Sequence, residues 1–439
     1  MTNLSIGRLD LPDEQAWLAL TGTNVLDGLV GSDYQFNPGE EKTSQETVRL
    51  YLRGSQLQLR QWLDRLELFQ QQPADLFLRL WSEGLQAYGY AHIHQFTIKI
   101  LPGHLASFEK GSSELDLEIL RDSFFFGDEV PLPLTNSSGP PTTTGITIFN
   151  HDDNDVGHDN WFSVDVGSLN LKYPALLRFQ YENNFNGSDL GDFWIGSLPV
   201  SLGAPQPSLN LEAENGSGGT VVAHSLASGG NYCQYRWSGT RWQNLASWVL
   251  GPIEVSQLAG GSVLPLVRFF SPTLSHSLQL RIAIKLQDKL VFEGPVTDVV
   301  VGKGFASLDP LHLPLGELPM ESYTIPHQII LQAKQTDAGE HLLEMDDILL
   351  LPQHEFSGFH ALSGLKYPLK MIQDQMSGKS WSLQDSLEFK SHTHFGTGLR
   401  LQPALPQYFW CFQTDVSGSA PIDRTLSIRG WYRHQWRLP

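Results

Sequence analysis

Cysteine and basic residues are scarce in this sequence, and long apolar runs are missing from it. The two cysteines, Cys233 and Cys411, are too few for a disulfide framework and lack the spacing of zinc ligands. Free thiols predict synthesis in a reducing cytoplasm. No apolar stretch reaches the length of a membrane span, and the first residues lack the basic segment and apolar core of a signal peptide. We therefore expect no membrane span and no disulfide-stabilised secreted fold.

The charge balance is strongly acidic. Asp and Glu number 47 against 29 Lys and Arg, which gives a net charge of −18, and no run of basic residues interrupts the excess. Such a chain repels phosphate backbones, so no sequence-specific nucleic-acid partner is expected. Solubility is the ordinary interpretation of this charge. The sharper interpretation is a surface past which DNA slides without sticking.

The chain has enough apolar material for several cores. Hydrophobic residues make up 41% and charged residues 17%, and 40 glycines with 26 prolines supply many turns. A length of 439 residues suggests about three domains. Long helical patterns are absent beyond residue 72, which argues against a Rossmann fold, a P-loop domain or a (β/α)₈ barrel.

One amphipathic helix is predicted, over residues 56–72. Ser55 is a suitable N-cap, and Gln58 three residues later completes a capping box. Helical spacing then places five apolar side chains on one face. These are Leu59, Trp62, Leu63, Leu66 and Phe69.

Most other segments alternate apolar and polar residues with a period of two, the pattern of strands with one buried face. Clear examples are 92–101, 114–120 and 278–286. A Pro/Thr/Ser/Gly-rich linker is predicted at 131–145, and a second at 200–209. The expected fold is mainly β: an N-terminal β-sandwich with one α-helix, followed by two jelly-roll or galectin-like β-sandwich domains. The predicted domains are 1–135 with the helix, 136–205 plus 353–439, and 206–352, the last as a jelly roll inserted into the second.

The segment NHDDNDVGHDN at 150–160 holds the densest set of hard ligands. Asp152, Asp153, Asp155 and Asp159 could bind Ca²⁺. The spacing does not satisfy an EF-hand, and a hydrolytic metal site with His158 would need ligands from elsewhere. An Asx-rich surface loop that caps its own backbone is the more ordinary interpretation.

Two further carboxylate pairs stand on strands that bound one β block. They are Glu212 with Glu214, and Asp346 with Asp347. If these are the first and last strands of one jelly roll, they are neighbours, and Glu212, Glu214 and Asp347 could hold a structural Ca²⁺. Strand ends that face solvent are the alternative. No other cofactor is expected.

Aromatic residues gather at 229–248. With Trp248 they form one aromatic cluster, and Tyr232, Tyr235, Trp237 and Trp242 could stack on the flat faces of a sugar, so a glycan site is predicted there. Packing in a core or a subunit interface is the commoner fate of such rings.

Histidines stand two apart at His92 and His94 and again at His392 and His394, which puts each pair on one strand face. No third metal ligand is evident from the sequence, so ordinary surface histidines are favoured. No nucleophile motif or defensible acid–base pair is present, and the chain is not expected to be an enzyme.

Several segments carry a resemblance to a known family. The strand TVRLYLRGS and the helix SQLQLRQWLDRLELF, with the alternating strands up to residue 135, resemble the N-terminal domain of siphophage and prophage distal tail (Dit-like) proteins and related minor tail proteins. LEAENGSGG, GGNYCQYRWSG and LEMDDILLLP are similar to parts of a carbohydrate-binding-module-like jelly roll, and RTLSIRGWYRHQWRL resembles the last strand of such tail proteins.

The resemblance implies a structural virion protein of the phage tail tip or baseplate, made in the host cytoplasm. It implies a homohexameric ring that connects the tail tube to the adsorption apparatus, with tape-measure and other baseplate proteins as partners. The alternative is a carbohydrate-binding adhesin module that recognises host cell-surface glycans.

Overall fold

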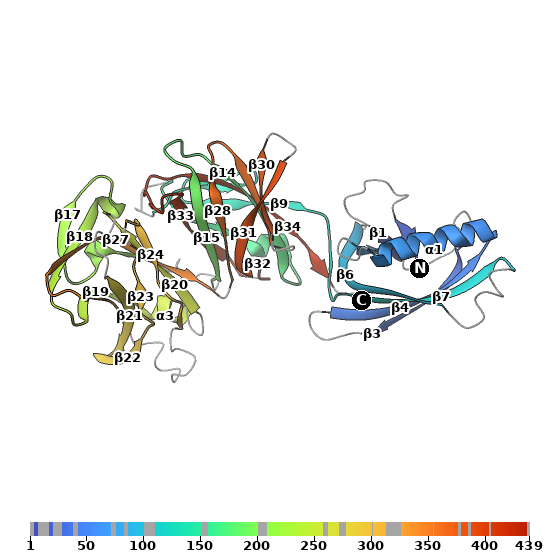
Figure 1. Ribbon diagram of the computed structural model, residues 1–439, viewed down its shortest axis with the longest axis horizontal. Coiled ribbons are helices and arrows are strands. Elements are labelled where there is room, and N and C mark those ends of the chain that lie inside the picture. Colours follow the sequence, from blue (N-terminus) through green and yellow to red (C-terminus); the bar gives the residue numbers. More distant parts are fainter. Residues whose placement is uncertain are drawn as a thin grey trace. The chain divides into compact units, whose positions relative to one another are not determined.

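The computed structural model shows a mainly β protein, as the sequence predicts (Figure 1). The structure describes residues 4–7, 17–20, 29–37, 43–71, 76–82, 87–100, 110–151, 157–200, 209–257, 262–271, 278–300, 302–312, 326–353, 355–375, 379–384, 388–403 and 405–436. By its internal contacts the chain divides into two compact units. Unit 1 comprises 1–129 and 433–439, and unit 2 comprises 130–432.

Unit 1 is a nine-stranded antiparallel arrangement with the path β2-β1-β5-β6-β7-β4-β3. Its strands are β1 (Leu4–Gly7), β2 (Leu18–Ala19), β3 (Leu29–Asn37), β4 (Thr43–Arg53), β5 (Phe77–Ser82), β6 (Ala87–Ile100), β7 (Ser112–Asp122), β8 (Phe125–Phe126) and β35 (Gln435–Trp436). The long β6 joins the two halves, because its first part pairs with β5 and its second part with β7. The end of the chain returns to this unit, where β35 pairs with β8.

The one long helix in the described part of the chain, α1 (Gln56–Gln71), follows β4 and contacts β6 (Figure 1). The predicted capping box is confirmed: the Ser55 backbone N–H donates to Gln58 Oε1 at 2.9 Å, and the Gln58 backbone N–H donates to Ser55 Oγ at 3.3 Å. Four of the five predicted apolar side chains are buried, and Leu63 is partly buried against the same core. The periodicity therefore fixes which face of the helix packs inward.

The core of unit 1 lies on one face of β4 and β7. Leu115, Leu117 and Ile119 are fully buried, as their alternation predicts. The same face ends in a buried ion pair, where Arg121 Nε donates to Glu46 Oε1 at 2.7 Å and both side chains are inaccessible to solvent.

Unit 2 contains a 14-stranded sheet with the path β11-β10-β13-β33-β15-β28-β31-β30-β29-β14-β34-β12; β32 pairs with β14, and β9 with β34. Its strands are β9 (Val130–Leu132), β10 (Leu134–Asn136), β11 (Gly139–Thr142), β12 (Ile146–Ile148), β13 (Trp161–Val164), β14 (Ala175–Asn183), β15 (Leu190–Pro199), β28 (Phe356–Leu365), β29 (Lys370–Asp374), β30 (Lys379–Gln384), β31 (Glu388–Gly398), β32 (Arg400–Leu401), β33 (Gln407–Asp415) and β34 (Leu426–Arg433). The sheet packs around a core rich in aromatic rings. The rings of Phe162 and Phe409, for example, stack with their centres 4.8 Å apart.

The strands that lie between β15 and β28 in the sequence form a sandwich of a seven-stranded and a five-stranded sheet (Figure 1). They are β16 (Asn210–Glu212), β17 (Thr220–Ala223), β18 (Asn231–Ser238), β19 (Gln243–Leu250), β20 (Ser262–Phe269), β21 (Gln279–Leu286), β22 (Lys289–Glu293), β23 (Thr297–Asp298), β24 (Phe305–Ser307), β25 (Leu311–His312), β26 (His327–Lys334) and β27 (Glu340–Pro352), with the short helix α3 (Pro252–Gln257). The first and last strands of this block, β16 and β27, pair directly, as the sequence suggests.

The two parts of unit 2 share apolar contacts. Trp194 and Leu198 of β15, with Trp410 and Phe412 of β33, belong to the core cluster of the inserted strands. Both faces of β15 are therefore covered, which explains its nearly continuous burial. Because contacts join the predicted second and third domains into one unit, the boundary between them stays a prediction.

The segment 131–145, predicted to be a linker, instead carries β9, β10 and β11. Its prolines are tolerated because β9 and β11 are edge strands in the described sheet, each with one partner, so a missing N–H there need not break a ladder. The unit boundary falls before residue 130 rather than after 135, and residues 433–439 join unit 1. Most of the second predicted linker, 201–208, lies outside the described residues.

Candidate functional site

The most unusual polar feature of unit 2 is a cluster of carboxylates inside the inserted sandwich. Glu212 ends β16 and stands opposite Asp347 of β27 in the register. The pairing of β20 with β27 shifts so that Arg268 opposes Asp347 and Phe269 opposes Met345, which leaves Asp346 as an extra residue in β27. This bulge lets two successive aspartates reach the same buried region.

Ser228 joins two of these carboxylates. It begins the short 3₁₀ helix η5 (Ser228–Gly230), where its backbone N–H donates to Asp346 Oδ1 at 2.8 Å and its hydroxyl donates to Glu212 Oε1 at 2.8 Å. Glu214 lies in a second 3₁₀ helix, η4 (Ala213–Asn215), directly after β16. Local turns on both sides thus position the cluster.

Arg268 is the cation of the cluster. Its Nε lies 3.5 Å from Asp347 Oδ1, and its Nη2 donates to the backbone carbonyl of Asn150. Arg268, Asp346 and Asp347 are each at most 2% exposed. One buried side chain thereby connects the inserted sandwich to the neighbouring sheet, at the start of the predicted acidic loop.

The carboxylates outnumber their partners. Glu212 Oε2, Glu214 Oε2 and both oxygens of Asp347 are buried and have no hydrogen-bond partner. Burial raises the pKa of Asp346 to about 8, and the charge of Asp347 adds to the rise. Burial also raises the pKa of Glu212 well above its usual range. A bound cation would offset this repulsion, because buried like charges disfavour ionisation.

The arrangement does not yet form a tight coordination shell. Across the described ranges, the one group that brings three ligand atoms within 4.8 Å of one another is His92, His94 and Asp122 in unit 1. A structural Ca²⁺ at Glu212, Glu214 and Asp347 therefore stays a prediction, with the orphaned oxygens as its physical motive.

The predicted acidic loop is only partly described. Asp152, Asp153 and Asp155 lie outside the described residues. Asp159 is buried, and its Oδ2 accepts hydrogen bonds from the Ser137 backbone N–H at 3.0 Å and the Ser137 hydroxyl at 2.7 Å. Asp159 thus holds a neighbouring turn, as an Asx-rich loop would.

The predicted glycan-binding rings are dispersed. The ring of Tyr232 stacks on that of Phe270, with ring centres 4.0 Å apart, and Tyr235 is 2% exposed within the core. Trp242 is half-buried, with Arg281 4.4 Å from its ring centre, and Trp237 is half-buried against His341. Trp248 belongs to the core, where its indole donates to the backbone of Glu212. Only Trp237 and Trp242 of the predicted set keep substantial exposed surface.

The second histidine pair is divided. His394 is held by the hydroxyls of Ser380 at 2.9 Å and Ser357 at 3.3 Å, and burial lowers its pKa. The side chain of His392 lies outside the described residues.

Sequence reasoning missed a cleft in unit 2. Its volume is about 430 Å³, and its lining includes Asp192, Asp298, Lys303 and Asp415. These residues come from distant parts of the chain, so no local motif could reveal them.

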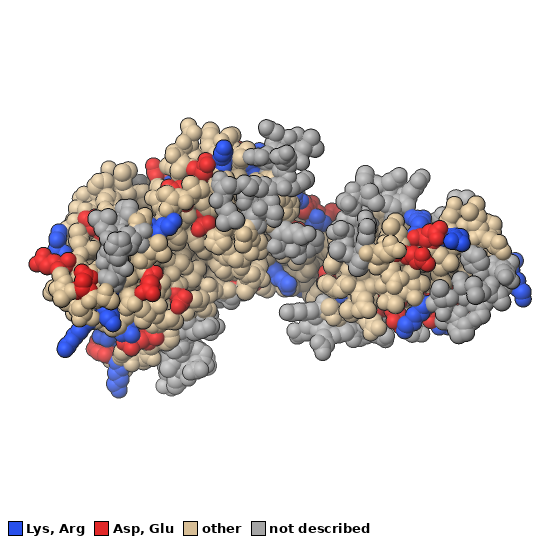
Figure 2. Space-filling model, in the orientation of Figure 1, with Lys and Arg blue, Asp and Glu red and all other residues tan. Residues whose placement is uncertain are grey.

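None of the described helices is long and apolar enough to cross a membrane. Acidic and basic side chains are interspersed on the face drawn in Figure 2, with much uncharged surface between them.

No protein-family model matches the chain, and no curated protein matches it. The chain is similar to a chain of the phage P2 baseplate in its activated conformation with Ca, at 10% identity over 77% of this chain and 100% of that chain, with a TM-score of 0.20. It is similar to an exo-β-1,3-galactanase from Phanerochaete chrysosporium with galactose, at 12% identity over 73% and 81%, TM-score 0.20. It is also similar to VP2 of infectious bursal disease virus, at 9% identity over 72% and 82%, TM-score 0.19. Likenesses this weak assign neither a family nor a function.

Proposed function

We propose that the chain is a structural protein of a phage tail tip or baseplate, which assembles with copies of itself and with other tail proteins. The proposal begins from the resemblance of the N-terminal segment to distal tail proteins. It is supported by the multi-sandwich β architecture. The net charge of −18 fits a particle that DNA must pass without binding.

The observation that carries the proposal is the edge of unit 1. Strand β3 spans nine residues, and among the described strands it pairs with β4 alone. One side of its backbone thus presents N–H and C=O groups that another strand can bind. Proteins cover such long edges, and pairing with the next subunit of a ring covers every one of them.

Sedimentation velocity of the full chain tests assembly. A ring of six copies of the 49.1 kDa chain has a mass of about 295 kDa. The expected result is a discrete oligomer at micromolar concentration. A strictly monomeric species at the highest soluble concentration contradicts the proposal.

Two neighbouring substitutions test the role of β3. In an antiparallel edge strand, successive N–H groups point alternately to the partner strand and away from it. Of Tyr34→Pro and Gln35→Pro, one removes a bond to β4 and the other removes an outward N–H. The variant that keeps the wild-type melting temperature is expected to lose the oligomer. If that variant assembles normally, β3 does not form the contact between subunits, although the proposal that the chain forms an oligomer would still hold.

Glycan recognition is the second candidate, motivated by the exposed parts of Trp237 and Trp242. Host cell-wall polysaccharide is expected to change the tryptophan fluorescence of the wild-type protein but not of Trp242→Ala, with Trp81→Ala in unit 1 as a matched control. If the polysaccharide does not change the fluorescence of the wild-type protein, glycan recognition is excluded.

A further inference from the structure

Unit 1 brings one histidine pair and an aspartate together on the face of the sheet away from its core. In the β6–β7 ladder Ile93 stands opposite Arg121, so His92 and Asp122 are the next opposed positions, on the other face. Ala91 and Ile93 are fully buried in the core, which confirms that the histidines point the opposite way.

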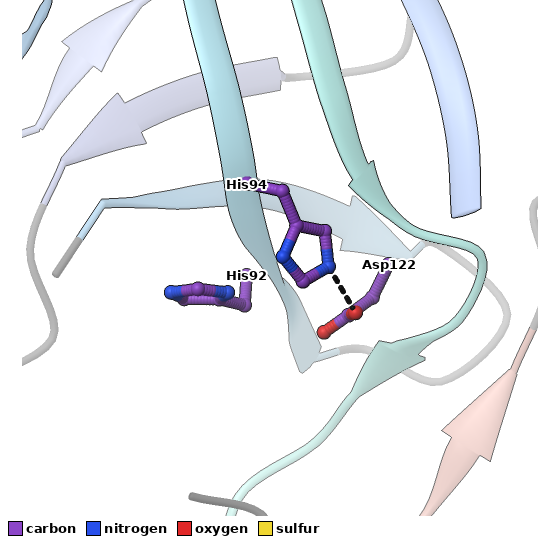
Figure 3. A group of neighbouring side chains, drawn as sticks. All are labelled: His92, His94 and Asp122. Carbon is purple, nitrogen blue, oxygen red and sulfur yellow. Dashed lines mark hydrogen bonds and ion pairs between the residues drawn. The ribbon is translucent and has the colours of Figure 1, made fainter. Parts of the chain in front are cut away.

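A bulge completes the group. The register shifts between Ile93 and Gln95, so His94 is an extra residue in β6. Bulges re-aim side chains, and here His94 Nε2 lies 2.7 Å from Asp122 Oδ1 (Figure 3). The rings of His92 and His94 meet edge to face, with centres 5.0 Å apart.

The three side chains offer a converging and accessible set of ligands. One ligand atom from each lies within 4.8 Å of the other two. His94 and Asp122 are about two-fifths exposed, so an ion can enter from solvent. His92 packs edge-on against Phe77, with ring centres 5.3 Å apart, which restricts its orientation.

This donor set selects a class of metal. Two imidazole nitrogens and one carboxylate oxygen suit Zn²⁺ and similar transition-metal ions, whereas Ca²⁺ prefers six or more oxygens. Ligands about 2.1 Å from a tetrahedral ion lie about 3.4 Å apart. Small side-chain rotations would bring the three atoms to that spacing.

We propose that His92, His94 and Asp122 form a binding site for a divalent transition-metal ion of the zinc class. The ion ties β6 to β7 across the bulge and keeps at least one coordination position open for water or an incoming ligand. This site is independent of the tail-assembly proposal, since it needs a single copy of unit 1.

The test is titration of the metal-free full chain with ZnCl₂ by calorimetry. Zinc is expected to bind one high-affinity site per chain and to raise the melting temperature. His92→Ala and His94→Ala are each expected to weaken this binding by about ten-fold or more. Excess Ca²⁺ is expected not to compete.

His360→Ala is the matched control. His360 Nδ1 lies 2.9 Å from Asp192 Oδ1 at similar exposure, but this pair belongs to no group of three ligands in the described chain. Its loss should leave the zinc isotherm unchanged. Circular dichroism confirms folding, and the visible spectrum of bound Co²⁺ reports the coordination independently. Wild-type zinc affinity and cobalt spectrum in both folded His92 and His94 variants, or no zinc binding by the wild type, would overturn the proposal.

Discussion

Replacement of Arg268 by methionine is expected to destabilise unit 2 strongly. The substitution keeps most of the side-chain volume but removes the guanidinium beside Asp346 and Asp347, which are both buried. Removing one partner of a buried ion pair costs about 3–5 kcal/mol, because the remaining charge stays in a poor environment. The hydrogen bond to the Asn150 carbonyl is lost with it. We expect a cost of about 4 kcal/mol at pH 8.

The cost should depend on pH. At pH 5, Asp346 is protonated in the folded chain, because burial raises its pKa to about 8. Less negative charge then remains uncompensated, and the same variant should lose less stability than at pH 8. Urea denaturation, monitored by hydrogen-exchange mass spectrometry of β27 peptides, measures the free energy of unfolding of unit 2 separately from that of unit 1. The double variant Arg268→Met with Asp347→Asn should recover part of the loss. A cost below about 1 kcal/mol at pH 8, or equal costs at both pH values, would show that Arg268 does not compensate the buried aspartate charge.

Three other predictions concern stability. In metal-free buffer, the stability of unit 2 should fall as pH rises from about 4 to about 8, since the folded chain keeps a proton on Asp346 that the unfolded chain releases. Millimolar Ca²⁺ should flatten this pH dependence in thermal melts. An unchanged pH dependence would argue against a cation at the carboxylate cluster. Arg121→Met should cost unit 1 about 3–5 kcal/mol, because Glu46 is left buried without its partner; Glu46→Gln in the same chain should restore part of this, and no recovery would show that the charge is not the cause. Ser55→Ala should cost about 1 kcal/mol in the same assay through loss of the α1 cap, and a neutral result would mean that tertiary contacts alone hold the helix.

Local patterns predicted much of the fold because the information lies within a few residues. The capping box at Ser55 and the apolar face of α1 depend on spacings of three and four residues. The buried alternation of Leu115, Leu117 and Ile119 depends on the period of a strand. Even the contact of Glu212 with Asp347 followed from one topological assumption, that the first and last strands of a jelly roll are neighbours.

The features that sequence reasoning missed depend on register between distant strands. His94 and Asp346 are placed by bulges, which exist only relative to the partner strand. Asp122 becomes the third ligand because β7 returns beside β6 at that position. No pattern in the sequence around Arg268 predicts its role, because its partners come from β27 and from Asn150. In 131–145, the prolines suggested a linker, yet β9 and β11 contain them because edge strands tolerate a missing N–H.

Assembly through β3 is tested most directly by amide hydrogen exchange in Leu29–Asn37 at protein concentrations below and above the point where the oligomer forms. We expect the outward amides of this strand to exchange slowly only in the oligomer, while the amides of β4 are unaffected. Identical exchange of β3 at both concentrations, with the oligomer present, would contradict it.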